Sequence, residues 1–311
     1  MIQQDLRGVF VVLATPFRED ESLDVEGLEH LVDWVLERKP HGLTILGIAG
    51  EVYKLTDAER EIVLQTVTRR ASVPVIVGAG HPGGTRGTIA YCLAAETAGA
   101  AAVMVAPPFV AKPSADQIVE FYSDVNRRIA IPIVIQDEPS TTGILMPSTL
   151  LARIADYCPG CRYAKIEHLP TPPKISEIAA LVPDARLGLF GGSGGLYFLD
   201  ELRRGARGIM TGFAYPEILV RIWENELTGS HSDATGIFHQ WLPLIKLEAQ
   251  QTIGVALRKE ILRRRGALPH ATVRRPAPLL DTGTIRELDA LQLTLDGNVR
   301  DSRADDQRNG G

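Results

Sequence analysis

The sequence contains few cysteines, no long apolar segment and no excess of basic residues. Its 311 residues include 3 cysteines, and this odd number argues against a disulfide framework. The longest apolar runs, such as AAAVMVAPPFV, are too short to cross a bilayer, and the acid-bearing start MIQQDLRGVF predicts no signal peptide. A net charge of -5 gives no basic footprint for nucleic acid. We therefore expect a cytoplasmic protein with neither a membrane nor a nucleic-acid partner.

Two of the cysteines, Cys158 and Cys161, form a CxxC pair. A redox CxxC follows a strand and opens a helix, whereas this pair precedes a predicted strand. A structural zinc site would need two further ligands, and none occurs at a suitable spacing in the sequence. We expect neither a redox motif nor a metal site.

Two glycine clusters also invite a functional interpretation. The segment GAGHPG, residues 78–83, matches the GxGxxG pattern of dinucleotide sites, but the next predicted strand lacks the acidic residue that holds the ribose. We interpret it as a sharp turn and expect no cofactor. The second cluster, GGSGG at residues 191–195, is typical either of a phosphate-binding loop or of a loop kept small to leave room for substrate, and we favour the small loop.

Strand-like and helix-like segments alternate along most of the chain. The predicted strands are Val9–Ala14, Gly42–Leu46, Pro74–Val77, Ala102–Val105, Pro132–Gln136, Arg162–Glu167, Arg186–Phe190 and Gly208–Thr211. The predicted helices between them are Asp24–Arg38, Thr56–Arg70, Thr85–Ala98, Ser114–Arg128, Pro147–Asp156, Thr171–Leu181, Leu196–Arg204 and Pro216–Leu227. Eight such pairs, spaced by about thirty residues, indicate a (β/α)8 barrel, the TIM barrel. A doubly wound open sheet is the alternative, although it usually has fewer units.

Three regions are expected along the chain. Residues 1–232 are predicted to form the barrel, and residues 233–295 a C-terminal helical extension that covers the barrel or makes a subunit interface. The polar, glycine-ended remainder, residues 296–311, is predicted to be a disordered tail.

One of the seven lysines, Lys165, lies in a predicted strand, whereas the other six lie beside turn signals or helix starts or in polar-patterned helices. Side chains alternate along a strand, so Tyr163, Lys165 and Glu167 share the face that points into the barrel, near the C-terminal mouth. A buried ammonium needs a partner or loses its proton, and a neutral lysine amine can attack a ketone to give a Schiff base. The alternative is a buried ion pair between Lys165 and Glu167 without a catalytic role.

Three segments, GLTILGIAGE, IPIVIQDEPSTTG and YAKIE, resemble the dihydrodipicolinate synthase/N-acetylneuraminate lyase family in order and spacing. Members are class I aldolases and dehydratases on (β/α)8 barrels, and the resemblance covers roughly residues 5–295. It implies a Schiff base between Lys165 and the keto carbon of a pyruvate-like 2-keto acid. It also implies a homo-oligomer, either a dimer or a tetramer.

The loop 47–51, GIAGE, corresponds to the family's GxxGE motif. In relatives, the backbone N–H groups of the second and third residues hold the substrate carboxylate, so the resemblance assigns this role to Ile48 and Ala49. Relatives often carry two threonines there, and the hydroxyl of the second belongs to a proton relay. Ala49 has no hydroxyl, so this part of the relay is missing.

Three further positions depart from the family pattern. Gln136 stands where relatives carry the tyrosine that shuttles protons, and Phe109 stands where they carry the tyrosine that completes the relay. Thr141 stands where dihydrodipicolinate synthases carry the arginine that holds the aldehyde substrate. An amide cannot exchange protons as a phenol does. These departures argue against dihydrodipicolinate synthase activity, and we expect Phe109, Thr141 and, on the last predicted strand, Met210 to contact a different substrate.

The segments IQDEP, AKIEHLP and FHQWLPLIKLEAQ are similar to the L-2-keto-3-deoxyarabonate dehydratase branch of the family, although the GIAGE loop differs. That branch also has glutamine at the tyrosine position and a Lys-x-Glu on the sixth strand. We therefore predict a Schiff-base dehydratase of a 3-deoxy-2-keto sugar acid, with Lys165, Glu167 and Gln136 as catalytic residues. The alternatives are a retro-aldolase releasing pyruvate, a dihydrodipicolinate synthase-like condensation, and a barrel that binds a keto acid without turnover.

Overall fold

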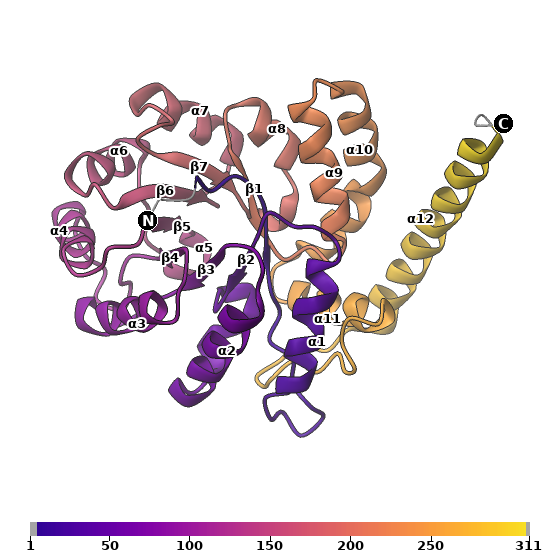
Figure 1. The fold of residues 1–311 in the computed structure, drawn as a ribbon, viewed down its shortest axis with the longest axis horizontal. Coiled ribbons are helices and arrows are strands. Elements are labelled where there is room, and N and C mark those ends of the chain that lie inside the picture. Colours follow the sequence, from indigo (N-terminus) through magenta and orange to yellow (C-terminus); the bar gives the residue numbers. More distant parts are fainter. Residues whose placement is uncertain (1–4, 309–311) are drawn as a thin grey trace.

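Eight parallel strands close into a barrel in the structure, a computed structural model that describes the backbone of residues 5–308 and the side chains of residues 5–295 (Figure 1). Each strand pairs with the next, and the last pairs with the first. The strands are β1 (Gly8–Val12), β2 (Gly42–Ile45), β3 (Val75–Gly78), β4 (Ala102–Val105), β5 (Ile133–Asp137), β6 (Cys161–Ile166), β7 (Gly188–Gly191) and β8 (Gly208–Thr211). The predicted (β/α)8 barrel is confirmed, and the open sheet was the wrong alternative.

The helices that connect the strands form a ring outside the barrel (Figure 1). They are α1 (Val25–Leu36), α2 (Asp57–Arg70), α3 (Thr85–Thr97), α4 (Ala115–Asn126), α6 (Ser148–Tyr157), α7 (Thr171–Leu181), α8 (Phe198–Arg203) and α9 (Pro216–Leu227). Every predicted strand and helix boundary in the barrel holds to within two residues. Capping boxes at Thr56 and Ser114 fix the starts of α2 and α4. In each box the cap hydroxyl accepts a hydrogen bond from the backbone N–H of the third helical residue, and the side chain of that residue accepts one from the backbone N–H of the cap.

Short turns at the mouth of the barrel were not predicted. They are α5 (Pro139–Thr142) and the 3₁₀ turns η1 (Ile48–Gly50), η2 (Val52–Lys54) and η3 (Ser193–Gly195). Each has three or four residues, which is too short to show a hydrophobic period. All four follow the C-terminal ends of strands, where they shape the loops above the barrel interior.

Apolar side chains fill the inside of the barrel and form a second, larger layer between the strands and the helices. The inner cluster consists of Leu6, Phe10, Ile76, Ala102, Met104, Val134, Tyr163, Phe190 and Met210. Tyr163 is fixed near the N-terminal end, because its hydroxyl accepts a hydrogen bond from Leu6 N at 3.1 Å. The residue two positions further along the same face of β6 is Lys165, so the interior changes from apolar to charged toward the C-terminal ends of the strands.

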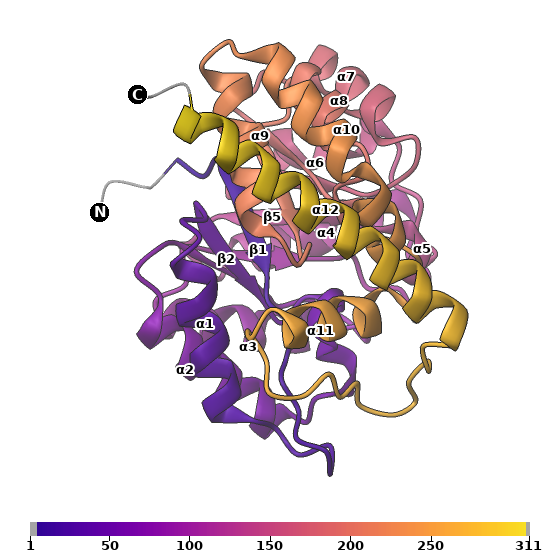
Figure 2. The same cartoon turned by 90° about the vertical axis from the view of Figure 1, so that its right-hand side faces the viewer.

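The C-terminal extension contains α10 (His231–Glu248), α11 (Gly254–Arg264) and α12 (Thr282–Arg308). α10 packs against α9, α11 and α12, and Figure 2 shows α12 running across the side of the molecule over α10. The helical extension predicted from residue 233 thus begins two residues earlier, at His231. Among the described helices, none combines the length and the apolar character that a membrane span requires.

The tail differs from the sequence prediction. We expected residues 296–311 to be disordered, but α12 continues without a break to Arg308, and residues 309–311 lie outside the described part of the chain. The segment from Thr282 to Arg308 contains no proline. Each residue of it therefore keeps the N–H group that a helix needs, whatever the polarity of its side chain.

Closure of the barrel requires a glycine where β1 meets β8. A Cβ atom at Gly208 would lie 1.9 Å from the carbonyl oxygen of Gly8, closer than any side chain can approach a backbone atom. Gly236, inside α10, is the opposite case, because no atom lies within 4 Å of its Cβ position. The two glycines therefore differ in what an added methyl group would meet.

We expect Gly208→Ala to lower the free energy of unfolding by roughly 1–3 kcal/mol or more, because the strands must separate to admit the methyl group. Gly236→Ala should raise it by about 0.5–1 kcal/mol, because alanine loses less backbone freedom in a helix. Urea unfolding of both variants, followed by circular dichroism, measures the two effects. Equal effects in the two variants would contradict the role of Gly208 in closing the barrel.

Candidate active site

Two neighbouring strands, β5 and β6, bring the three predicted catalytic residues together at the C-terminal mouth of the barrel. Gln136 and Lys165 are partners in the parallel register. Lys165 Nζ lies 2.9 Å from Glu167 Oε2, and Gln136 donates from Nε2 to the same oxygen at 3.5 Å. The three side chains therefore form one polar group above an apolar interior.

Gly191, the last residue of β7, and Gly192 form a two-glycine segment, and its second glycine makes room for the carboxylate of Glu167. A Cβ atom at Gly192 would lie 2.6 Å from Glu167 Cγ and 2.7 Å from its Oε1. The next residue, Ser193, donates its backbone N–H to Glu167 Oε1 at 3.3 Å. The GGSGG loop thus leaves space for the side chain of Glu167, which is predicted to be catalytic, and holds it with a backbone donor.

A second carboxyl group, Glu138, lies close to this group. Glu138 follows Gln136 by two residues, and its Oε2 accepts the Thr141 N–H at 2.9 Å. Burial raises the pKa of Glu138, and the negative charge of Glu167 raises it further. Glu138 was not among the predicted site residues, although its spacing from Gln136 repeats that of Lys165 and Glu167 and was a usable signal.

A buried ion pair flanks the site behind β5. Asp137 is completely buried, and its Oδ2 lies 2.6 Å from Lys174 Nζ. Lys174 also donates to the Met146 carbonyl oxygen at 2.7 Å and lies 2.9 Å from His168 Nδ1. Lys174 is buried in the first turn of α7, which packs against the barrel.

A further buried acid, Glu201 of α8, lies on the other side of the two-glycine segment. Its Oε1 accepts from Thr171 Oγ1 at 2.5 Å, whereas its Oε2 has no hydrogen-bond partner among the described residues. A Cβ atom at Gly191 would lie 1.7 Å from Oε2, so only a glycine allows this carboxyl group to lie against β7. Burial raises the pKa of Glu201 to about 8, and the charge of Glu167 adds to the effect. No sequence signal marked this residue within a short, polar helix.

The remaining predicted site residues also lie at the mouth or below it. Ile48 and Ala49 lie in η1, after β2, and both are partly exposed. Phe109 is half-buried in the loop after β4, and Thr141 is exposed in α5. Met210 is fully buried in the inner apolar cluster. Contact of these five residues with a substrate stays a prediction.

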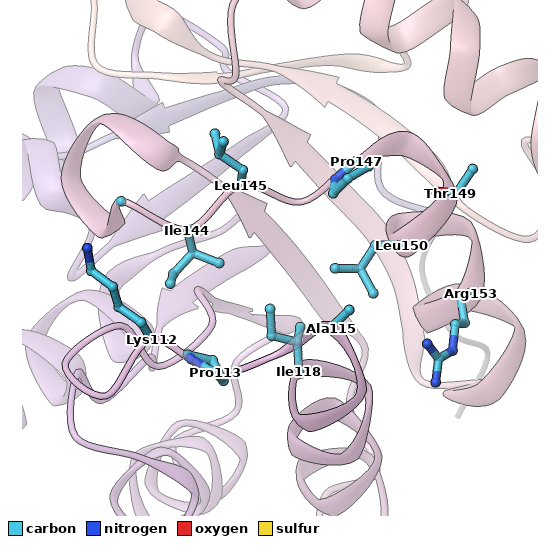
Figure 3. A pocket seen from close by; sticks show the side chains of 11 residues that line it. Lys112, Pro113, Ala115, Ile118, Ile144, Leu145, Pro147, Thr149, Leu150 and Arg153 are labelled. Carbon is cyan, nitrogen blue, oxygen red and sulfur yellow. The ribbon is translucent and has the colours of Figure 1, made fainter.

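A groove of about 630 Å³ lies outside the barrel, between the start of α4 and the segment that joins α5 to α6 (Figure 3). Lys112, Ile144, Leu145 and Arg153 are among its lining residues. The three predicted catalytic residues do not line it. The candidate site is therefore the mouth of the barrel, where the charged groups converge.

Comparison with known proteins identifies the family of the chain. The model of the dihydrodipicolinate synthetase family matches residues 5–292. The chain belongs to the dihydrodipicolinate synthetase family. It is thus an enzyme of the dihydrodipicolinate synthase/N-acetylneuraminate lyase group, as its resemblance predicted.

Members of the dihydrodipicolinate synthetase family match nearly the whole chain. L-2-keto-3-deoxyarabonate dehydratase from Azospirillum brasilense is 36% identical over 296 residues, 93% of this chain and 94% of that protein. 4-Hydroxy-tetrahydrodipicolinate synthase from Archaeoglobus fulgidus is 31% identical over 258 residues, 82% of this chain and 86% of that protein. The crystal structure of dihydrodipicolinate synthase from Rhodopseudomonas palustris has a TM-score of 0.87 at 33% identity, covering 93% of this chain and 97% of that one. The predicted resemblance to the family and to the dehydratase branch is confirmed.

The buried acid Glu201 should make stability depend on pH. Its pKa is 4.5 without burial and about 8 in the fold, so between these values the unfolded chain has lost a proton that the folded chain keeps. Stability from this group is therefore full below about pH 4.5 and falls as pH rises toward 8, by up to about 1.4 kcal/mol per pH unit. We expect the stability of Glu201→Gln relative to the unmodified protein to increase over this range.

Urea unfolding at several pH values between 5 and 8 measures this difference. Glu120→Gln, at an exposed position on α4, is the matched control and should show a constant offset. A constant offset for Glu201→Gln as well would mean that Glu201 is ionised in the folded protein.

Proposed function

We propose that this protein is a Schiff-base-forming hydro-lyase that removes water from a 3-deoxy-2-keto sugar acid. The observation that carries the proposal is the contact of 2.9 Å between Lys165 Nζ and the Glu167 carboxylate, with the Gln136 amide on the same oxygen. In the described part of the chain, no tyrosine hydroxyl is hydrogen-bonded to these three residues. The named activity of the Azospirillum brasilense relative supports the same reaction class.

The first step joins the substrate to Lys165. Glu167 is placed to take a proton from the ammonium group, which leaves an amine that attacks the C2 ketone. Glu167 then returns this proton to the former carbonyl oxygen, which leaves as water, and the product is the protonated imine. The backbone N–H groups of Ile48 and Ala49, at the same end of the barrel, would hold the neighbouring carboxylate.

The second step is the elimination. The protonated imine withdraws electrons from C3, so a base can remove a C3 proton. A double bond forms between C3 and C4 as the C4 hydroxyl leaves as water with the proton that the base returns. Glu167 is the base in this scheme, because its carboxylate reaches the imine nitrogen and is held by Ser193 N–H and Gln136. Gln136 holds a hydroxyl by hydrogen bonds without changing its protonation state.

Retro-aldol cleavage with release of pyruvate is the competing reaction of the same imine. It needs a base on the C4 hydroxyl, the role that a tyrosine plays in relatives and that the Gln136 amide cannot perform. Family resemblance further favours a cytoplasmic dimer or tetramer, which light scattering on the purified protein would test.

Lys165 should form an imine that borohydride reduces. With pyruvate we expect the mass of one pyruvyl group on the peptide that contains YAKIEHLP, and no addition in Lys165→Met. Intact-mass and peptide mass spectrometry measure both. A protein that never gains mass at millimolar pyruvate would be explained better by a buried ion pair without catalysis.

Glu167→Gln should lower turnover of a 3-deoxy-2-keto sugar acid by roughly 10²–10⁴ while imine trapping persists, because the amide cannot accept the C3 proton. Turnover is measured on a panel of keto acids by product mass, which separates loss of water from release of pyruvate. If trapping disappears together with turnover, Glu167 only tunes or positions Lys165. Release of pyruvate as the main product would show that the protein is an aldolase and not a hydro-lyase.

A further inference from the structure

A cluster of buried charges lies behind the loop that would hold the substrate carboxylate. The last residue of this loop, Glu51, is fully buried, and its Oε1 lies 2.5 Å from Lys259 Nζ. Its Oε2 lies 3.0 Å from Lys54 Nζ. Lys259 comes from α11 and is also fully buried. The C-terminal extension therefore reaches the back of the substrate loop.

The cluster carries one positive charge in excess. Two ammonium groups, of Lys54 and Lys259, share the single carboxylate of Glu51, while the adjacent Arg274 is balanced by Glu59 at 2.6 Å. The other partners of the two lysines are neutral, because Lys259 donates to the Thr272 carbonyl oxygen at 2.8 Å and Lys54 donates to the Arg274 carbonyl oxygen at 2.6 Å.

Burying a cation without a balancing anion costs free energy, and a balanced ion pair or apolar side chains would fill the same space at a lower cost in free energy. The loop that would hold the substrate carboxylate provides a role for the excess positive charge. Ile48 and Ala49 offer only backbone dipoles, whereas the carboxylate of a 2-keto acid brings a full negative charge. At roughly 10 Å and an intermediate dielectric, one excess positive charge changes the affinity for such an anion roughly tenfold.

We propose that Lys259, together with Lys54, is a positioning residue that gives the loop 48–51 the positive potential with which it binds the carboxylate of the keto acid. The inference rests on the proposed function, because that function places the carboxylate on the N–H groups of Ile48 and Ala49. The C-terminal extension is then a part of the active site and not only a cover for the barrel.

The protonation of Lys259 gives the proposal a second readout. Burial lowers its pKa to about 8, although the charge of Glu51 opposes the shift. It is therefore mostly charged at pH 7, and the cluster loses its excess charge as pH rises through 8. The groups that face Lys259 are Glu51, Lys54 and Arg274, the Phe17 ring at 4.4 Å and the Thr272 carbonyl oxygen.

The test compares Lys259→Met with Lys246→Met, which removes the same charge from an exposed position on α10. We expect the first variant to raise the pyruvate concentration for half-maximal imine trapping, and the KM for the keto acid, roughly tenfold with little change in kcat. The control should leave both unchanged. Glu51→Gln/Lys259→Met restores the single excess charge and should recover most of the affinity.

An unchanged pyruvate affinity in Lys259→Met would overturn the proposal. A double variant no better than the single one would overturn it as well, because the cluster would then only support the fold. Lys54→Met should lose affinity to the same extent. Because Lys54 is less buried, this variant replaces Lys259→Met in the test if Lys259→Met does not fold.

Between pH 7 and 9 the KM of the unmodified protein should rise toward that of Lys259→Met. If the KM values of the two proteins instead change with pH in parallel, the proposal is also overturned. A lack of trapping in the unmodified protein would instead refute the proposed function.

Discussion

Closure of eight parallel strands into a ring is the constraint on which the rest of the molecule depends. Once the last strand pairs with the first, alternate residues of every strand must face one interior, and all C-terminal strand ends meet at one mouth. The same pleat that buries Tyr163 in the apolar interior places Lys165 above it. The register of β5 and β6 then sets Gln136 beside Lys165 without any contact between their side chains being required.

Buried cations around this mouth are each paired with a carboxylate, either from the same strand end or from another element. Lys165 is paired with Glu167, and other pairs join Lys174 to Asp137 and Arg258 to Glu248. Such pairs add little net stability, because desolvation offsets much of the attraction, but the loss of one partner is costly.

Two glycines leave the space that two carboxyl groups near the site occupy. Gly191 and Gly192 lie back to back between Glu201, outside the barrel, and Glu167, inside it. A side chain at either position would displace one of the two carboxyl groups. The glycine-rich loop after β7 is thus explained by the space needed for protein side chains, which sequence inspection alone had left open between a small loop and a phosphate site.

The alternation of apolar strands and amphipathic helices determined the barrel, and the one lysine within a strand determined the candidate site, because both signals are local and repeat with a fixed period. Glu138 was missed although its spacing from Gln136 is a local signal. Glu201 and Lys259 were missed because their burial depends on which segments pack together, and no local pattern encodes that. The helical tail to Arg308 was missed because polarity was taken for disorder. The sequence by itself thus determined the fold and the position of Lys165, whereas only the tertiary structure decided which charges surround it, since those charges come from loops and helices far apart in the chain.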